Sequence, residues 1–232
     1  MAISTATRKE WLVARKALLS REKLFTLQRD ELSEARRALP WVLVEEPYVF
    51  DGQSGVRTLP DLFEGKSQLI IYHFMFGPDW DAGCPSCSFW IDNFDGVQAH
   101  LAARDTALAL VSTALYATLS AFKTRMGWSL PWFSTHGSDF NTDYGVTFDT
   151  DPDQPNTANY NYRPISEPPS EMPGISVVIK DDAGVVYHTY SAYSRGLDMV
   201  NGAYQLLDLT PKGRDEADLQ FSMSWLRRHD EY

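Results

Sequence analysis

The chain has 232 residues, of which 44% are apolar and 13% aromatic, and this composition predicts a folded protein with a sizeable core. Its formal net charge of −10 argues against a nucleic-acid partner, because binding to a polyanion depends on clustered Lys and Arg. The amino-terminal segment lacks the apolar core of a secretion signal, and no apolar run approaches the ~18 residues that a membrane span needs. We therefore expect a cytoplasmic protein that has neither a nucleic acid nor a membrane as its partner.

Residues 7–39 have the pattern of a helix with charged residues of both signs on its exposed face. Thr7 and Glu10 have the spacing of a capping box at its start, and Pro40 stops it. We expect residues 1–39 to form an amino-terminal helical extension. Two arrangements stay open: the extension packs on the main domain, or it is the arm of a homodimer.

The next part of the chain alternates strands and helices. Residues 41–68 indicate short strands around a Gly-rich turn, and residues 69–76 form an apolar run that suits a central strand buried on both faces. A helix is predicted from residue 84 or 85 to about residue 104, a second buried strand over 107–114, and a second helix over 115–128. This order implies a right-handed crossover and a parallel pair of strands.

The carboxy-terminal part begins with a segment rich in Pro, Asn and Asp. Residues 149–174 predict a long loop that is too polar and too rich in proline for a regular element. Two apolar stretches, 175–180 and 185–193, then flank the turn "DDAG", which is a strong signal for an antiparallel hairpin. A last helix is expected near 196–208, and the remaining residues form a carboxy-terminal extension.

The chain has two cysteines, Cys84 and Cys87, which fall between a buried strand and a helix. In a cytoplasmic protein such a close pair indicates redox chemistry or a metal site rather than a structural disulfide. Pro85 suits the first helical position, where free backbone N–H groups favour a thiolate at Cys84. We interpret Cys84 as the nucleophile with a low pKa and Cys87, one turn later and more buried, as the thiol that resolves the mixed disulfide. Asp79 and Asp81 act in the opposite direction, because negative charge raises the pKa of a thiol.

The order of these elements, with C-x-x-C at the start of a helix after a buried strand, resembles the thioredoxin fold. "CPSC" is more similar to the glutaredoxin type of centre than to that of thioredoxin, and "GSDFNTDYGV" is similar to a Ser-Asp and Tyr-Gly-Val pattern of peroxiredoxin-like proteins. Together with "YHFMFGPDW", "GCPSCSFW" and "HTYSAYSRGLDMVNGAYQLLDL", these motifs resemble a bacterial family of thioredoxin-like proteins classed as a domain of unknown function. The resemblance implies an α/β protein with a thioredoxin-like fold over residues 40–232, in which helices flank a central mixed sheet.

The resemblance also implies roles for further residues. Thioredoxins place a cis-proline before the strand that faces the cysteine pair; Pro173 is the matching residue, and it also fits an ordinary loop proline. His73 falls where thioredoxins bury an acid, and it is interpreted either as a general base for the pair or as a core histidine with satisfied partners. Trp80 and Pro85 join Pro173 as candidate substrate-binding residues, with simple packing as the alternative for Trp80. A peroxiredoxin mechanism is not expected, because Asp81 stands where those enzymes have Thr or Ser three positions before the reactive cysteine.

A zinc site is the first alternative for the cysteine pair. C-x-x-C can supply half of a tetrahedral site, but the chain has no second C-x-x-C and its histidines are isolated in the sequence, so we expect no metal. The sequence also contains no Gly-rich phosphate loop, and we expect no cofactor.

The sequence therefore predicts a thiol-disulfide oxidoreductase with Cys84, Cys87 and His73 as catalytic residues. Its substrate is expected to be a thiol or disulfide, either a small molecule or a protein, and reducing equivalents arrive from another thiol. The alternative is a thioredoxin-fold binding scaffold without turnover. In that interpretation the centre of the long loop, with Tyr160, Tyr162 and Arg163, holds a small ligand or a partner over the Cys84 end.

Overall fold

The computed structural model describes residues 5–148 and 157–232. The contacts within the chain divide it into two units, Met1–Pro40 and Trp41–Tyr232, next to the predicted border between residues 39 and 40. No helix in the described ranges is both long enough and apolar enough to cross a membrane.

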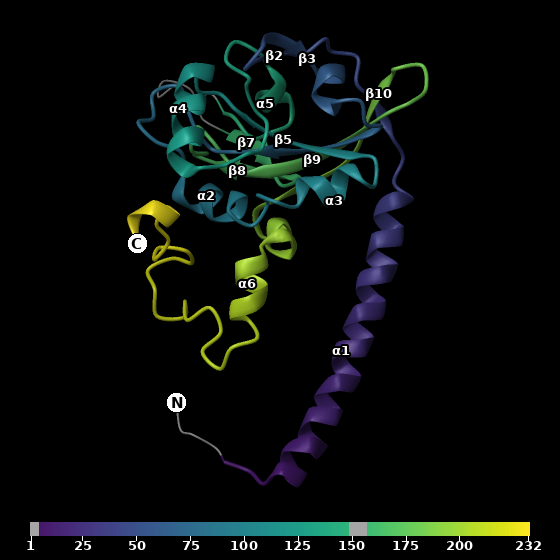
Figure 1. Cartoon of the computed structure of the whole chain (residues 1–232), viewed down its shortest axis with the longest axis vertical. Coiled ribbons are helices and arrows are strands. Elements are labelled where there is room, and N and C mark those ends of the chain that lie inside the picture. The colour runs from purple at the N-terminus through teal and green to yellow at the C-terminus, as the bar shows by residue number, and fades with distance from the viewer. Residues whose placement is uncertain (1–4, 149–156) are drawn as a thin grey trace. The chain divides into compact units, whose positions relative to one another are not determined.

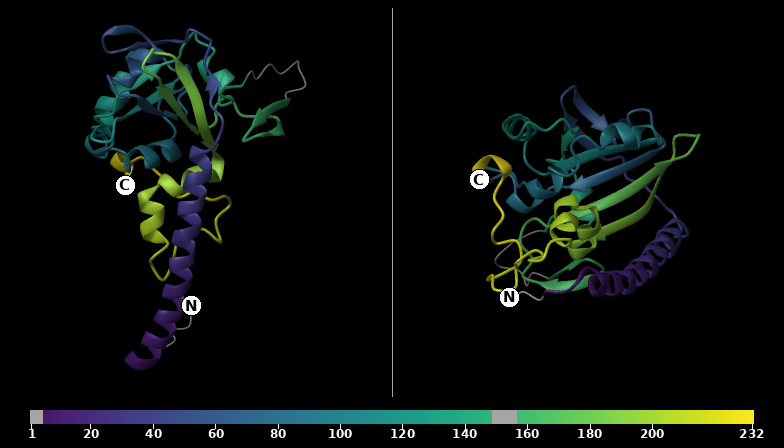
Figure 2. Two further views of the ribbon diagram at one scale, coloured as in Figure 1. Left: turned by 90° about the vertical axis from the view of Figure 1, so that its right-hand side faces the viewer. Right: turned by 60° about the horizontal axis from the view of Figure 1, so that its bottom comes forward.

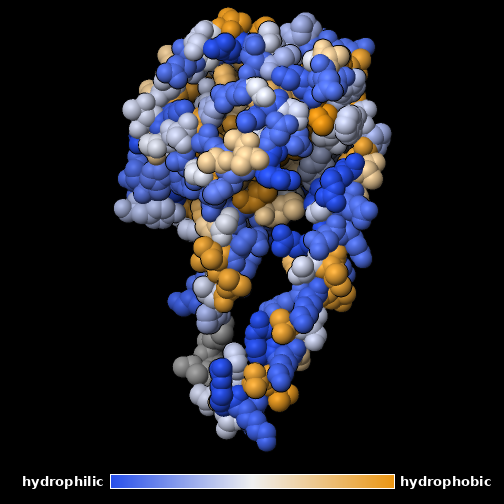
Figure 3. Space-filling model, turned by 45° about the vertical axis from the view of Figure 1, so that its right-hand side comes forward, coloured by the Kyte–Doolittle hydropathy of each residue, from blue (hydrophilic) through white to orange (hydrophobic). Residues whose placement is uncertain are grey.

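The first unit is one long helix, α1 (Arg8–Arg37), and the helix predicted here is confirmed. The predicted capping box is present at its start: the Glu10 N–H donates to Thr7 Oγ1 at 3.3 Å, and the Thr7 N–H donates to Glu10 Oε2 at 2.8 Å. None of its described side chains is buried, and large apolar side chains lie exposed among charged ones (Figure 3). Some of them recur at every seventh position, which is the period of a coiled-coil seam: Trp11, Leu18, Phe25 and Leu32.

The second unit is built on an eight-stranded sheet with the order β1-β10-β9-β4-β5-β6-β2-β3. Its strands are β1 (Val42–Leu43), β2 (Val49–Gly52), β3 (Gly55–Thr58), β4 (Gln68–His73), β5 (Thr106–Ser112), β6 (Trp132–Ser134), β9 (Gly174–Lys180) and β10 (Val186–Tyr193). The strands β4, β5 and β6 are parallel and every other pairing is antiparallel, so the predicted mixed sheet is confirmed. The order β10-β9-β4-β5, with a crossover from β4 to β5 and a β9–β10 hairpin, gives this unit a thioredoxin-like fold.

Helices cover both faces of the sheet, as Figure 1 shows. One face carries α2 (Pro85–Ile91) and α3 (Gln98–Ala102), and the other carries α5 (Phe140–Asp143). The short helical elements of the unit are η1 (Leu59–Phe63), α2 (Pro85–Ile91), α3 (Gln98–Ala102), α4 (Tyr116–Met126), α5 (Phe140–Asp143), η2 (Ser194–Val200), α6 (Gly202–Leu207) and η3 (His229–Glu231). Each face therefore has its own hydrophobic core, which meets the other core at the central strands.

Strand β4 contributes to both cores, because successive side chains of a strand point to opposite faces. Tyr72 belongs to the core that contains Cys87 and the aromatic residues of α2 and α4. Leu69 and Ile71 belong to the core that contains Phe140 of α5. Both faces of this strand are buried, which explains why its sequence is a continuous apolar run.

Three predicted elements differ from the observed ones. The helix expected over residues 84–104 is two short helices, α2 and α3, because the chain turns at Gly96 with a φ of 92° that a helix cannot continue. The strand predicted over 69–76 ends at His73. The last helix, expected near 196–208, is the 3₁₀ helix η2 followed by α6.

The expectation that residues 149–174 contain no regular element is wrong for the middle of this segment. Strands β7 (Thr157–Tyr160) and β8 (Arg163–Ser166) form a two-stranded antiparallel hairpin, and residues 149–156 lie outside the described part. Figure 2 shows the hairpin, in green, as an element separate from the main sheet. A further isolated bridge pairs Thr147 with Glu171.

Candidate functional site

Cys84 is the residue that caps the amino end of α2, and Pro85 occupies the first helical position. The Cys84 N–H donates to the carbonyl oxygen of Met75 at 3.1 Å, which ties it to the segment that follows β4. The Cys84 carbonyl accepts from both the N–H and the hydroxyl of Ser88, each at 2.9 Å. The backbone on both sides of the thiol is therefore held in place.

The two cysteines lie 3.9 Å apart and both are free thiols. Cys84 is half-buried and Cys87 is buried. The thiol of Cys87 donates to the sulfur of Cys84, and backbone N–H groups of Cys87 and Ser86 add further hydrogen bonds, so the pKa of Cys84 falls to about 6. Burial raises the pKa of Cys87, and its bond to Cys84 raises it further. The pair thus consists of one sulfur that ionises easily and one that holds its proton.

Tyr72 is a third member of the site that the sequence did not reveal. Its hydroxyl hydrogen-bonds to Cys87. Burial is the main cause that raises the pKa of Tyr72, and the neighbouring Cys87 raises it further. The backbone N–H of Met75 donates to the Cys87 sulfur at 3.5 Å. Two donors therefore point at the buried sulfur of Cys87 and stabilise its ionised form when it forms.

His73, predicted as a general base for the cysteine pair, points to the opposite face of the sheet. Its Nδ1 lies 3.2 Å from Asn141 Oδ1 and its Nε2 lies 2.9 Å from Ser176 Oγ. The ring stacks on Phe140 at 5.7 Å between centroids. Burial lowers the pKa of His73 to about 4, so the ring is neutral at pH 7. This placement fits the alternative of a core histidine with satisfied partners, because strand alternation separates His73 from the thiols.

A cavity of about 340 Å³ opens at the two cysteines. Pro173 lies in its wall, so the structure brings this predicted residue to the cysteine pair. Most of the wall is apolar, with a polar part made by hydroxyl groups and one charged pair. The lining residues are Tyr72, Met75, Cys84, Ser86, Cys87, Trp90, Tyr160, Met172, Pro173, Ser194, Arg195, Leu197, Asp198 and Met223.

Pro173 is held by the β7–β8 hairpin. The hydroxyl of Tyr160 donates to the carbonyl oxygen of Pro173 at 2.8 Å and accepts from the N–H of Ser194 at 2.9 Å. The peptide bonds of the described residues are all trans, including the one before Pro173. The register of the sheet explains the position of Pro173: Gly174, the next residue, pairs with His73 at the end of β4, directly before the segment that carries the cysteines.

The other two candidate substrate-binding residues lie outside the cavity wall. Trp80 is half-buried and packs over Gly77, where an added Cβ would lie 2.9 Å from the indole nitrogen. Pro85 is half-buried at the start of α2. Neither residue lines the cavity, and the position of Trp80 agrees with the packing alternative.

The carboxy-terminal extension reaches the site at two points. Met223 lines the cavity, and Nε and Nη2 of Arg228 donate to the carbonyl oxygen of Gly83 at 3.0 and 2.7 Å. An added Cβ at Gly83 would lie 2.6 Å from the ring of Phe74, so this loop packs closely on the core. The extension therefore positions the residue directly before Cys84.

Glu171 is a buried carboxyl group two residues before Pro173. It accepts hydrogen bonds from the hydroxyl of Thr113 at 2.6 Å and from that of Thr147 at 3.1 Å. Burial raises its pKa to about 7, against the two hydrogen bonds that act to lower it. Among residues 5–148 and 157–232, no group of three or more His, Cys, Asp or Glu side chains is arranged to hold a metal ion.

The fold and the site together define a thioredoxin-like α/β protein with two neighbouring cysteines at the amino end of a helix. The chain belongs to the family described as "Bacterial protein of unknown function (DUF899)", which matches it over residues 1–232. No curated protein matches the chain.

Several solved structures are similar to the chain. The peroxidoxin BcpB of Mycobacterium tuberculosis is 12% identical with a TM-score of 0.45, over 73% of this chain and 97% of that one. A variant of peroxiredoxin Q from Xanthomonas campestris is 12% identical with a TM-score of 0.48, over 75% and 98%. A candidate thiol:disulfide interchange protein, DsbE, from Chlorobium tepidum is 15% identical with a TM-score of 0.37, over 66% and 86%. At these identities none of the likenesses assigns a reaction to this chain.

Proposed function

We propose that the protein is a thiol-disulfide oxidoreductase in which Cys84 is the nucleophile and Cys87 the resolving thiol. The observation that carries the proposal is the geometry of the pair: the two cysteines lie 3.9 Å apart at the amino end of α2 and line a cavity, and the pKa of Cys84 is lowered to about 6 whereas that of Cys87 is raised. At pH 7 most of Cys84 is therefore a thiolate, whereas Cys87 keeps its proton until the first step is complete. The half-buried Cys84 lines a cavity, and this gives a reactant a route to it.

The reaction proceeds in two exchanges. The Cys84 thiolate attacks one sulfur of a substrate disulfide; the S–S bond of the substrate breaks, a mixed disulfide forms, and the first substrate thiolate takes a proton from water. Cys87 then loses its proton and attacks the sulfur of Cys84, which releases the second substrate thiol. The substrate gains two electrons and the pair becomes a disulfide, which an external dithiol must reduce before the next cycle.

The cavity favours a small molecule over a protein as the substrate. The Cys84 thiol lies in a cavity of about 340 Å³, whose walls include Tyr160 of the hairpin and Met223 of the carboxy-terminal extension. Such a volume is within the range of small-molecule sites. The apolar walls fit a substrate with an apolar body.

The proposal is tested with the reduced protein and 4,4′-dithiodipyridine, a small neutral disulfide whose released thione absorbs light. The wild type is expected to release two thiones per chain and to end as an internal disulfide. Cys87→Ser is expected to release one and to retain the other as a mixed disulfide that mass spectrometry detects. Cys84→Ser is expected to react at least ~100-fold more slowly, because the remaining thiol is buried and has a raised pKa.

The double variant Cys84→Ser/Cys87→Ser is the matched control, since the chain contains no other cysteine. Catalytic turnover is measured next, with dithiothreitol as the reductant and either a small dialkyl disulfide, 2-hydroxyethyl disulfide, or native insulin as the oxidised substrate, and the rate without the protein is subtracted. Equal reaction rates of Cys84→Ser and the wild type, or the absence of turnover with both substrates, would contradict the proposal. The second result would favour a binding scaffold without turnover.

A further inference from the structure

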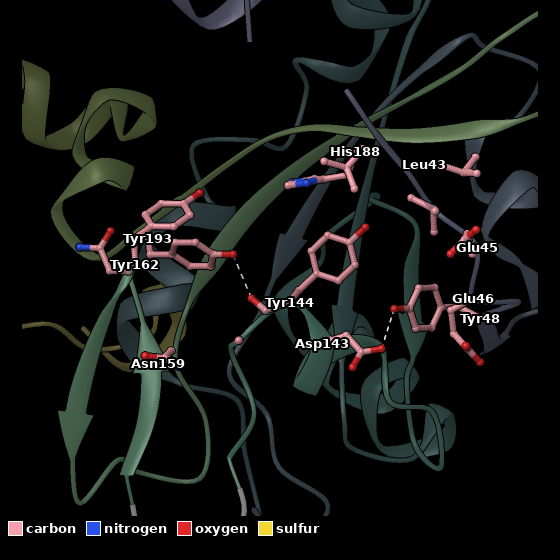
Figure 4. Close-up of a pocket in the computed structure, with 14 residues that line it drawn as sticks. Leu43, Glu45, Glu46, Tyr48, Asp143, Tyr144, Asn159, Tyr162, His188 and Tyr193 are labelled. Carbon is pink, nitrogen blue, oxygen red and sulfur yellow. Dashed lines mark hydrogen bonds between the residues drawn. The ribbon is translucent and has the colours of Figure 1, made fainter. Parts of the chain in front are cut away.

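A second cavity, of about 470 Å³, lies apart from the cysteines within the same unit. Figure 4 shows the side chains that surround it, which come from β1 and the residues after it, the end of α5, the β7–β8 hairpin and β10. Neither cysteine lines this cavity, and His73 and Pro173 do not line it either. Its walls therefore call for an explanation separate from the thiol chemistry.

Four tyrosines form the aromatic part of the wall, and three of them are anchored by their hydroxyl groups. Tyr48 donates to Asp143 Oδ2 at 2.6 Å, Tyr162 donates to the carbonyl of Ser191 at 2.9 Å, and Tyr193 donates to the carbonyl of Tyr144 at 2.9 Å. Figure 4 shows the bonds of Tyr48 and Tyr193 as dashed lines. These hydrogen bonds fix the ring faces before any ligand arrives, which reduces the entropy lost on binding.

Tyr144 occupies the centre of the aromatic group. Its ring centroid lies 5.4 Å from that of His188, with the two rings perpendicular, and 6.4 Å from that of Tyr48. On its other side it meets the buried ring of His73 at 5.6 Å. Tyr144 is thus supported from behind, and Figure 4 shows it between His188 and Tyr48 at the cavity.

The charged groups of the wall all have the same sign. Glu45, Glu46 and Asp143 line the cavity, and no Lys or Arg is among its lining residues. His188 is the remaining titratable base; burial lowers its pKa, and its Nε2 lies 2.8 Å from Ser191 Oγ. The formal charge of the wall is therefore negative, which favours a cationic ligand over an anionic one.

We propose that this cavity binds a small organic cation, such as a quaternary or protonated amine, between the tyrosine rings and the carboxylates. Ring faces of Tyr attract a cation through their quadrupole, and sets of aromatic rings are the usual means of recognising quaternary ammonium groups. The carboxylates supply long-range attraction and the apolar side chains of Val42 and Leu43 supply contact for the carbon body of the ligand. A cavity of about 470 Å³ is of the size that holds such ligands.

Calorimetric titration of the full chain with three compounds of nearly equal shape tests the proposal. The compounds are choline, its neutral carbon analogue 3,3-dimethylbutan-1-ol, and the anion 3,3-dimethylbutanoate. Choline is expected to bind at least ~10-fold more tightly than the neutral analogue. The analogue has the shape of choline but no positive charge, so it makes neither the cation–π contact with the rings nor the ionic attraction to the carboxylates. No binding of the anion is expected.

Variants then locate the binding. Tyr162→Leu is expected to weaken choline binding ~5-fold or more, and it should fold, because Tyr162 is 77% exposed. Tyr144→Leu is expected to have a larger effect, with circular dichroism as the check on its fold, and Glu46→Gln a smaller one. Asp218→Asn, which removes an exposed charge of the same unit that does not line the cavity, is the matched control and should leave the affinity unchanged.

Equal affinities for choline and the neutral analogue would overturn the proposal, as would unchanged binding by both tyrosine variants. The double variant Cys84→Ser/Cys87→Ser is expected to bind choline as the wild type does. Choline binding without any thiol reaction would support this proposal and contradict the proposed function. Thiol reaction without choline binding would do the opposite.

Discussion

Tyr72 and His73 are neighbours on the same strand, and both side chains are 1% exposed, but they face different surroundings. Tyr72 points to the α2 side, where its hydroxyl meets the sulfur of Cys87. His73 points to the α5 side, where both ring nitrogens have partners, Asn141 and Ser176. One residue step along β4 thus separates the surroundings of the cysteine pair from a buried polar cluster.

The difference shows how the fold keeps two buried polar systems apart. The cluster of His73 continues through Ser176 Oγ to Ser191 Oγ at 2.8 Å, and from there to His188 Nε2. Both ring nitrogens of His73 and the hydroxyls of Ser176 and Ser191 have partners within the protein, which is the arrangement of a structural network, whereas His188 at its end lines the cavity of about 470 Å³. On the other face the Cys84 thiol reaches a cavity, and its pKa is shifted toward reactivity.

The largest expected effect on stability comes from His73→Leu. The substitution leaves the amide oxygen of Asn141 and the hydroxyl of Ser176 without the imidazole in the core, so we expect a loss of about 3 kcal/mol in the free energy of unfolding. Urea unfolding at pH 7 measures it. The alkylation rate of Cys84 in the folded variant should stay within about twofold of the wild-type rate. A large fall in that rate with unchanged stability would assign His73 to the chemistry after all.

The pH dependence of stability is the next comparison, between two buried titratable groups, His73 and Glu171. The pKa of His73 is lowered to about 4 in the folded state, so its contribution is present above pH 6.5 and is lost as the pH falls toward 4. The pKa of Glu171 is raised to about 7, so its contribution is present at low pH and is lost as the pH rises from about 4.3 to 7. Between about pH 4.3 and 6.5 these two slopes have opposite signs and offset each other.

Glu171→Gln removes the contribution of Glu171 to the pH dependence of stability. We expect the variant to be about 2 kcal/mol more stable than the wild type at pH 8, where the wild type must hold a buried carboxylate, and to match it at pH 4. Thermal or urea unfolding across pH 4–8 measures the difference. A constant difference at all pH values would show that Glu171 does not titrate in this range.

The sequence predicted the parts of the molecule that depend on local signals. Thr7 and Glu10 specify the start of α1 by themselves, and the position of Cys84 between an apolar strand and a proline indicated a cap before α2. The parallel pairing of β4 with β5 followed from the strand-helix-strand order. These features need no information from distant parts of the chain.

The parts that were missed depend on tertiary contacts. A strand buried on both faces has no polar side to mark its orientation, so the sequence does not tell which face His73 occupies, and the prediction placed it with the cysteines while Tyr72 was missed. The β7–β8 hairpin lies in a Pro-rich and Asn-rich segment whose composition favours a loop, yet Tyr160 anchors it through hydrogen bonds to Pro173 and Ser194. Arg228 lies 145 positions from Gly83, and no sequence pattern connects the two.

The third prediction concerns how Cys87 controls Cys84. The Cys87 thiol is the largest cause of the lowered pKa of Cys84, so Cys87→Ala should raise that pKa, whereas Cys87→Ser keeps a donor and should raise it less. The rate of alkylation by iodoacetamide against pH gives the midpoint, which is expected near pH 6 in the wild type. The same midpoint in Cys87→Ala would mean that the backbone N–H groups of Ser86 and residue 87, together with the Ser86 hydroxyl, set the pKa.

The smallest expected effect isolates Tyr72 on the reactive face. Tyr72→Phe keeps the ring in the core and removes the hydroxyl that stabilises ionised Cys87, so the second exchange should slow about threefold while the first is unchanged. Stopped-flow release of the two thiones from 4,4′-dithiodipyridine separates these steps. Tyr160→Phe is the matched control, since Tyr160 lines the same cavity but bonds to Pro173 and Ser194. If the second thione is released more slowly in Tyr160→Phe alone, the rate of the second exchange depends on the shape of the cavity wall and not on the Tyr72 hydroxyl.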